Sequence, residues 1–208
     1  MNIVYLKEID STQTYIKQYI KTNGYKNPIA FVTQNQTNGI GSRDNSWETK
    51  VGNLFFSFVL DKKQLPKDLP LQSASIYFSY ILKDILMQNN SKVFLKWPND
   101  FYIDNKKIGG TITSMTKDLL YCGIGINLQK VNNSFGYLDI DININKLLTE
   151  YFKIIESYPL WKQIFSKFEI EFYKNNKFKT SDNILLKETT LQDDGSLLVE
   201  GKKVFSLR

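Results

Sequence analysis

Apolar runs alternate with polar interruptions along the whole chain, and their spacing predicts both strands and helices. Short, nearly continuous apolar runs are typical of buried strands, whereas apolar residues three and four apart are typical of helices. The predicted strands cover residues 2–9, 28–36, 52–60, 92–97, 101–103, 106–115 and 119–128. The predicted helices start after the Asp10-Ser11 cap, span 69–88 and 144–156, and start again near Pro159.

The order of these elements predicts the fold class. Helices and strands do not alternate strictly, so we expect an α/β (α+β) protein with helices packed on a mixed sheet, not a doubly wound fold. The pattern changes near Phe178, where short strands are broken by Asp-Gly and Glu-Gly turns. We therefore expect a main domain over residues 1–175 and a small all-β appendage over residues 178–208.

Composition excludes several classes of function. The 208 residues are 42% apolar, enough for a substantial core, but no 18-residue apolar run and no secretory signal pattern occur. A cytoplasmic location is expected by default. One cysteine and no histidine exclude an intrachain disulfide and histidine catalysis, and nearly exclude a structural zinc site. Cys122 lies in an apolar, strand-like run, so we expect a buried and inert thiol.

The net charge of +6 does not by itself indicate a nucleic-acid-binding protein. The lysines are scattered, and no cluster of five or more Lys and Arg residues occurs. A generally basic surface is the simpler interpretation. Such a surface favours acidic partners through the rate of association.

Four polar or glycine-rich stretches are candidates for a ligand site. Residues 10–13, 36–47, 96–110 and 123–127 each follow or end a predicted strand, where functional loops are common. Each one alone has an ordinary explanation as a helix cap, a turn or a solvated lysine pair. The chain lacks the glycine motifs of Rossmann and P-loop nucleotide sites, which disfavours both.

Taken together, these stretches resemble the motifs of biotin protein ligases. "KWPND" at 96–100 is followed, seven residues after its Asp, by the second lysine of "KKIGG". "DST" at 10–12, "QTNGIG" at 36–41, "W" at 47 before "GNL", and "GIGIN" at 123–127 occur in that family's order and at similar spacing. The terminal "SLR" is similar to the end of the family's small C-terminal domain. The resemblance covers essentially the whole chain.

The resemblance implies a fold, an activity and partners. The fold is a catalytic domain similar to class II aminoacyl-tRNA synthetases over residues 1–175, with a reduced SH3-like domain over residues 178–208. The activity is ATP-dependent activation of biotin to biotinyl-5′-AMP with Mg²⁺, followed by transfer to a lysine of a biotin carboxyl carrier protein. Since "DST" starts at residue 10, no N-terminal helix-turn-helix domain fits, and neither DNA nor a membrane is an expected partner. A homodimer is left open.

The resemblance also implies roles for individual residues. Lys107 is expected to be the essential cation between the carboxylate of biotin and the α-phosphate. Asn99 and Asp100 are the other expected catalytic residues, with any Mg²⁺ near Asp100, which is also a hypothetical base for the incoming lysine. The expected biotin-binding residues are Ser11, Thr12, Gln13, Gln36, Gly39, Ile40, Gly41, Ser42, Lys107, Gly110 and Gly123. The expected ATP-binding residues are Arg43, Trp47, Lys96, Lys107, Gly125 and Asn127.

The phosphate loop departs from the family's pattern. Relatives commonly have GRGRxGR where this chain reads "GIGSRDN" at 39–45, so Arg43 is the one arginine that remains. Fewer cations predict weaker retention of the adenylate and less selective labelling of nearby lysines.

Two other functions remain as alternatives. A lipoate or octanoate ligase shares the fold, although "KWPND" argues against it. A non-catalytic biotin-binding or nucleic-acid-binding regulator is the alternative from another class, and the scattered charge argues against it.

Overall fold

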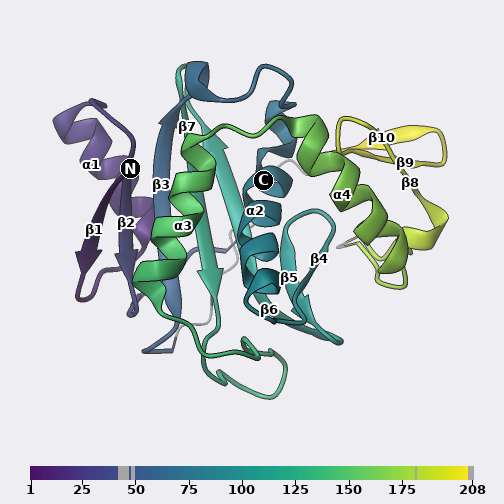
Figure 1. The fold of residues 1–208 in the computed structure, drawn as a ribbon, viewed down its shortest axis with the longest axis horizontal. Helices are drawn as coiled ribbons and strands as arrows, with labels where there is room; N and C mark the ends of the chain where they lie inside the picture. The colour runs from purple at the N-terminus through teal and green to yellow at the C-terminus, as the bar shows by residue number, and fades with distance from the viewer. Residues whose placement is uncertain (42–46, 48–49, 181, 206–208) are drawn as a thin grey trace.

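A seven-stranded mixed sheet forms the centre of the molecule (Figure 1). The computed structural model describes residues 1–41, 47, 50–180 and 182–205. The strand order is β1-β2-β3-β7-β6-β5-β4, and every neighbouring pair is antiparallel except the parallel pair β1 and β2. The strands are β1 Asn2–Leu6, β2 Ile29–Thr33, β3 Leu54–Asp61, β4 Phe94–Lys96, β5 Asp100–Ile103, β6 Lys106–Met115 and β7 Leu119–Ile126. The prediction of a mixed sheet with packed helices is confirmed.

Three helices and the main core lie on one face of the sheet (Figure 1). They are α2 Ala74–Gln88, α3 Ile144–Glu156 and α4 Trp161–Lys174. Alternate residues of β3 point to this face because side chains of a strand alternate between its two sides. Phe58 is fully buried there, with ring centroids 5.0 Å from Phe78, 6.0 Å from Tyr151 and 5.4 Å from Phe152.

Helix α1, Thr12–Asn23, covers only part of the opposite face. Its buried Ile16 and Ile20 pack in a second apolar cluster with Phe31 of β2, Val59 of β3 and Tyr121 of β7. Ser11 is the N-cap, and its hydroxyl oxygen accepts a hydrogen bond from the backbone N–H of Thr14. The part of this face that α1 leaves uncovered contains the candidate site.

A separate three-stranded antiparallel sheet follows α4, as the change of pattern predicted (Figure 1). Its strands are β8 Thr190–Leu191, β9 Leu197–Val199 and β10 Lys202–Val204. The exact boundary between domains, the SH3-like character of this sheet and the role of the terminal "SLR" at 206–208, which lies outside the described residues, stay predictions.

Two helices begin a few residues after their predicted starts. A 3₁₀ turn at Leu71–Ser73 follows Pro70, and α2 begins only at Ala74. Pro159 was expected in the first turn of a helix, but α4 begins at Trp161, after the N-cap Leu160. Among the described residues, no helix has both the length and the apolar character that crossing a membrane would require.

Candidate functional site

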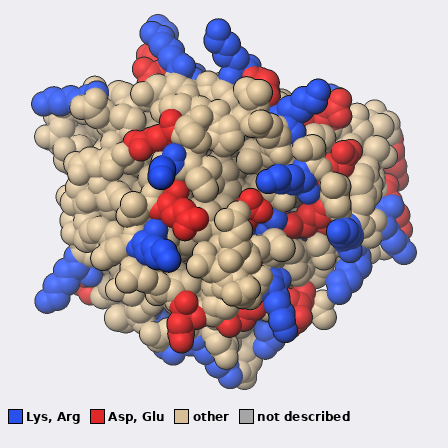
Figure 2. Space-filling view, in the orientation of Figure 1, with Lys and Arg blue, Asp and Glu red and all other residues tan. Residues whose placement is uncertain are grey.

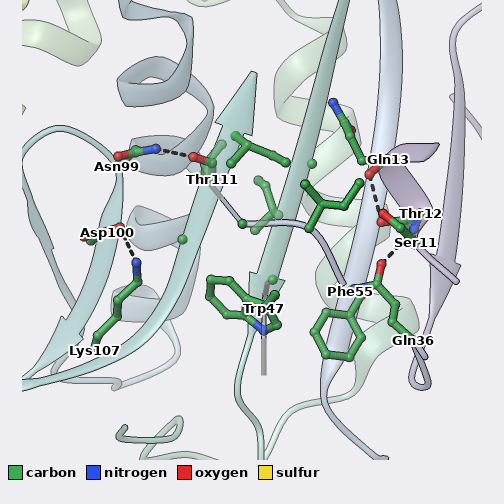
Figure 3. Close-up of a pocket in the computed structure, with 18 residues that line it drawn as sticks. Ser11, Thr12, Gln13, Gln36, Trp47, Phe55, Asn99, Asp100, Lys107 and Thr111 are labelled. Atoms are coloured by element: carbon green, nitrogen blue, oxygen red, sulfur yellow. Dashed lines mark hydrogen bonds and ion pairs between the residues drawn. The ribbon is translucent and has the colours of Figure 1, made fainter. Parts of the chain in front are cut away.

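A pocket opens between α1 and the strands β3, β6 and β7 (Figure 3). Residues from all four predicted loops line it: Ser11, Thr12, Gln13, Gln36, Ile40, Gly41, Trp47, Phe55, Ser57, Asn99, Asp100, Lys107, Gly110, Thr111, Ile112, Gly123, Ile124 and Gly125. The alternation of β7 explains the space. The side chains of Cys122 and Ile126 are buried in the main core, whereas Gly123 and Gly125, which have no side chain, face the pocket.

One end of the pocket is a set of uncharged polar groups (Figure 3). The start of α1 supplies Ser11 and Thr12, which are buried. The backbone N–H of Thr12 donates to Gln36 Oε1 at 2.7 Å, and Ser57 Oγ donates to Thr12 Oγ1 at 2.8 Å. This end is suited to a neutral ligand group that both donates and accepts hydrogen bonds.

The other end of the pocket carries an ion pair (Figure 3). Lys107 Nζ lies 2.7 Å from Asp100 Oδ1, and both side chains are partly buried. β5 and β6 bring the two residues together, because Asp100 pairs with Gly110 and Tyr102 with Lys107 in the strand register. A Cβ atom on Gly110 would lie 3.3 Å from Asp100 Oδ1 and 3.5 Å from Lys107 Nζ, so glycine leaves room for the pair.

Trp47 lies between the two ends of the pocket (Figure 3). Its backbone N–H donates to the carbonyl of Gly39 at 2.8 Å, and its ring packs on Gly125. The ammonium of Lys107 is 5.6 Å from the centroid of the indole ring, within the range of a cation–π contact. The ring therefore connects the charged end to the centre of the pocket.

Three buried polar atoms lack a hydrogen-bond partner among the described residues, and all three belong to the pocket lining. They are Gln13 Oε1, Trp47 Nε1 and Asn99 Oδ1. Buried polar atoms are nearly always paired in native proteins, because an unpaired one costs free energy. Their concentration in one place is the strongest physical sign that this pocket receives a polar ligand.

The structure leaves several of the predicted site residues away from the pocket. Gly39 holds the backbone of Trp47, and Lys96 has its ammonium 5.4 Å from the ring centroid of Tyr102. Asn127 is buried, its amide donates to the carbonyl of Gly136 at 3.2 Å, and its oxygen accepts from Asn53 at 3.3 Å. Asn127 thus fastens the end of β7, and none of the three lines the pocket.

Two further predictions fall outside the described residues, and five lining residues were not predicted. Ser42 and Arg43 belong to the first group, together with Asp44 and Asn45 of the phosphate loop. The unpredicted lining residues are Phe55, Ser57, Thr111, Ile112 and Ile124. All five lie inside strands, and only Ile124 falls within one of the four stretches that the sequence singled out.

The titratable groups near the pocket limit its chemistry. Burial, helped by the charge of Asp100, raises the pKa of Tyr102 to about 12, so this phenol stays protonated at neutral pH. No cluster of three His, Cys, Asp or Glu side chains that could hold a metal occurs within the described ranges. Asp100, the carboxylate of the lining, is already paired with Lys107, so the residues fit Mg²⁺ only as an ion held mainly by phosphates.

Comparison with known proteins agrees with this geometry. Residues 5–128 match the Biotin/lipoate A/B protein ligase family. The structure is similar to a biotin acetyl coenzyme A carboxylase synthetase from Helicobacter pylori with bound biotinylated ATP, with 36% identity, a TM-score of 0.90 and coverage of 98% of this chain and 99% of that one. The fold also matches a biotin protein ligase from Aquifex aeolicus, at 24% identity and a TM-score of 0.75, over 98% and 94% of the two chains.

The match covers more than half of the sequence, and the chain belongs to the Biotin/lipoate A/B protein ligase family. It is 33% identical to biotin–protein ligase 2 of Arabidopsis thaliana over 109 residues, which are 47% of this chain and 32% of that protein. It is 26% identical to the chloroplastic biotin–protein ligase 1 of the same plant, over 82% of this chain and 48% of that one. The chain spans about a third to a half of the length of these relatives.

Proposed function

We propose that the protein is an ATP-dependent biotin protein ligase. The observation that carries this proposal is the pocket itself: uncharged polar groups lie at one end, a lysine–aspartate pair lies at the other, and Trp47 lies between them. Biotin has matching ends: a neutral ureido ring that donates and accepts hydrogen bonds, and a carboxylate. The ureido ring would bind Ser11, Thr12 and Gln36, and the carboxylate would lie at Lys107.

The first step joins two anions. An oxygen of the biotin carboxylate attacks the α-phosphorus of ATP, the bond to the β-phosphate oxygen breaks, and pyrophosphate leaves. Lys107 would hold its ammonium between the carboxylate and the α-phosphate, where negative charge crowds in the transition state. Mg²⁺, when bound with the nucleotide, neutralises further phosphate charge. Asp100 fixes the lysine beforehand through their 2.7 Å contact.

The second step transfers biotin to a carrier protein. The amine of an acceptor lysine attacks the carbonyl carbon of the mixed anhydride, the bond to the phosphate oxygen breaks, and AMP leaves while the nitrogen loses a proton. Among the described residues that line the pocket, Asp100 is the one with a carboxylate, and it is the candidate for receiving that proton. An Asp100→Asn variant that transfers biotin from supplied biotinyl-AMP at the wild-type rate would remove this role.

Ligand entry requires the pocket to widen. Its free volume is about 40 Å³, whereas small-molecule sites usually measure about 300–1,000 Å³. The ring of Trp47 fills the space over Gly125, so this ring would have to move for a ligand to enter there. In an adenylate complex the same ring would be available to stack on the adenine.

The experiment that tests the function is exchange of labelled pyrophosphate into ATP, with biotin, octanoate or lipoate as the acid. Wild type should exchange only with biotin, and Lys107→Ala should lose about 100-fold or more of the rate. Lys106→Ala is the matched control, because Lys106 is the neighbouring lysine of β6 and is exposed outside the pocket. Exchange with octanoate or lipoate instead would move the chain to the lipoate branch of its family.

The arginine-poor phosphate loop adds a proposal about release. With Arg43 as the sole arginine at 39–45, biotinyl-AMP should dissociate faster than from a relative with the arginine-rich pattern. A half-life of the preformed adenylate complex as long as that of such a relative would contradict this proposal.

A further inference from the structure

The segment that carries Asn99 and Asp100 is held from outside the pocket. Residues 97–99 connect β4 to β5, and Asn99 and Asp100 then reach the pocket. On the pocket side, Asn99 is fastened to β6, since its amide donates to the carbonyl of Thr111 and its carbonyl accepts from the N–H of Thr111. The opposite side of the segment is fastened by the C-terminal part of the chain.

That second fastening has two hydrogen bonds. The indole N–H of Trp97 donates to the carbonyl of Gly195 at 2.9 Å in a buried position. Two residues earlier, the backbone N–H of Leu95 donates to Glu171 of α4 at 2.7 Å. Glu171 is itself held by Lys83, 2.6 Å away, whose side chain is almost fully buried. Gly195 and Glu171, the two acceptors, lie outside residues 5–128, which match the family.

The turn at residues 192–196 is built to present the Gly195 carbonyl. Gly195 has a φ of +79°, which favours glycine, and a Cβ atom there would lie 2.5 Å from Ser73 Oγ. Ser73 Oγ donates to the carbonyl of Asp194 at 2.5 Å, and Asp194 Oδ1 accepts from the N–H of Ser196 at 3.0 Å. The turn is therefore fixed against α2 and is not a free surface loop.

We infer that Trp97 is a positioning residue, which holds the 97–100 segment on the 192–196 turn and so sets the place of Asp100 and, through it, of the Lys107 ammonium. This inference rests on the proposed function. Misplacement of a reacting group by about 1 Å can cost roughly 100-fold in rate, so loss of one buried hydrogen bond in this chain of contacts should be visible in catalysis.

The molecule contains a matched control for this inference. Trp161, at the start of α4, also donates its indole N–H to the same turn, to the carbonyl of Asp193 at 2.8 Å. Trp97 and Trp161 are each 5% exposed. Phenylalanine at either position removes one indole N–H bond to the 192–196 turn, but only Trp97 belongs to the segment that leads into the pocket.

The test compares wild type, Trp97→Phe and Trp161→Phe in melting temperature, biotin affinity by calorimetry, and pyrophosphate exchange. Both variants should lose similar melting temperature, and Trp161→Phe should keep biotin affinity within about twofold, because Trp161 does not belong to the segment that leads into the pocket. Only Trp97→Phe should lower the exchange kcat, by about tenfold or more.

Equal exchange rates in the two variants would overturn the positioning role. Should Trp97→Phe not fold, Ser73→Ala decides instead: it loosens the 192–196 turn while Trp97 stays, so a lower exchange kcat supports the inference and an unchanged one overturns it. A wild type without biotin-dependent exchange would overturn the proposed function and the positioning role with it.

Discussion

Gly123 shows how a single position decides what the pocket can hold. A Cβ atom there would lie 2.9 Å from Gln13 Oε1, 3.0 Å from Ser57 Oγ and 3.3 Å from Ile112. Such an atom would also occupy space beside the unpaired oxygen of Gln13. Glycine at this position therefore keeps the polar end of the pocket open.

We expect Gly123→Ala to weaken biotin binding by about tenfold or more, since overfilling a packed site costs about 1–3 kcal/mol. Calorimetric titration with biotin would measure it. Gly24→Ala, at the C-cap of α1, is the control. Its φ of +72° makes the variant less stable, but Gly24 lies outside the pocket lining, so the folded variant should bind biotin as wild type does. Unchanged affinity in Gly123→Ala would contradict this account of the pocket.

Cys122 neighbours Gly123 but points to the other face of the sheet. Its side chain is fully buried, and burial raises the pKa of the thiol well above its ordinary value. The sequence-based expectation of a buried thiol is confirmed. A thiol-directed reagent should modify the folded protein at least about tenfold more slowly than the chain in denaturant, because the thiolate form is the nucleophile. Rapid labelling of the folded protein would show that this strand opens readily.

The residues of the pocket lining that lie in polar stretches were predictable from the sequence, whereas those that lie inside apolar runs were not. The polar stretches at the ends of predicted strands, where function is expected, contain Lys107, Ser11, Thr12 and Gln36. Ser57, in contrast, lies inside an apolar run that reads as a central strand. Whether it faces helices or a pocket depends on how much of the sheet α1 covers, and the pattern of β3 alone does not contain that information.

At the scale of elements, β3 contributes to both apolar clusters, with Phe58 in the main core and Val59 in the cluster under α1. Phe58 packs at near-perpendicular ring angles against Phe78, Tyr151 and Phe152, which belong to α2 and α3. The helical spacing of those aromatic residues and the apolar run of β3 predicted burial, and burial is confirmed for all four. The sequence could not tell which rings would touch, since the partners come from segments far apart in the chain.

Phe58→Ala should lower the free energy of unfolding by about 3–5 kcal/mol, because it removes buried contacts and leaves a cavity. Denaturant titration would measure the change. Tyr5→Ala on the edge strand β1 is the comparison; Tyr5 is 50% exposed, and a change within about 0.5 kcal/mol is expected there. A loss of less than 1 kcal/mol in Phe58→Ala would mean that α2 and α3 repack around the gap.

At the scale of the whole molecule, charge is spread and not concentrated. On the face shown in Figure 2, Lys and Arg side chains interleave with Asp and Glu, as the scattered lysines of the sequence predicted. A net charge of +6 distributed in this way favours association with an acidic partner without defining a nucleic-acid surface. Under the proposed function, the specificity for a carrier protein would then come from shape and from the pocket more than from long-range charge.

Acid should destabilise the fold through two carboxylates, Asp194 and Asp139, that accept several hydrogen bonds. Burial alone would raise the pKa of Asp194, but hydrogen bonds from Lys203 and Ser196 outweigh it and lower this pKa below its ordinary value of 3.8. The pKa of Asp139 is lowered in the same way: burial alone would raise it, but hydrogen bonds from Ser91 and from the backbone N–H of Lys92 lower it. Each depressed pKa stabilises the fold fully above about pH 4 and ceases to do so as the pH falls through the folded-state value.

The double variant Asp139→Asn/Asp194→Asn should therefore be less stable than wild type at pH 7, and the gap should close as the pH falls from about 4 to 2. Denaturant titrations at a series of pH values would measure it. Because the turn at 192–196 depends on Asp194, acid should also loosen the hold on Trp97 before the main core unfolds. Tryptophan fluorescence would report this change. The double variant should already show the changed fluorescence at pH 7. A stability gap that stays constant over this pH range would mean that these carboxylates act through packing and not through their charge.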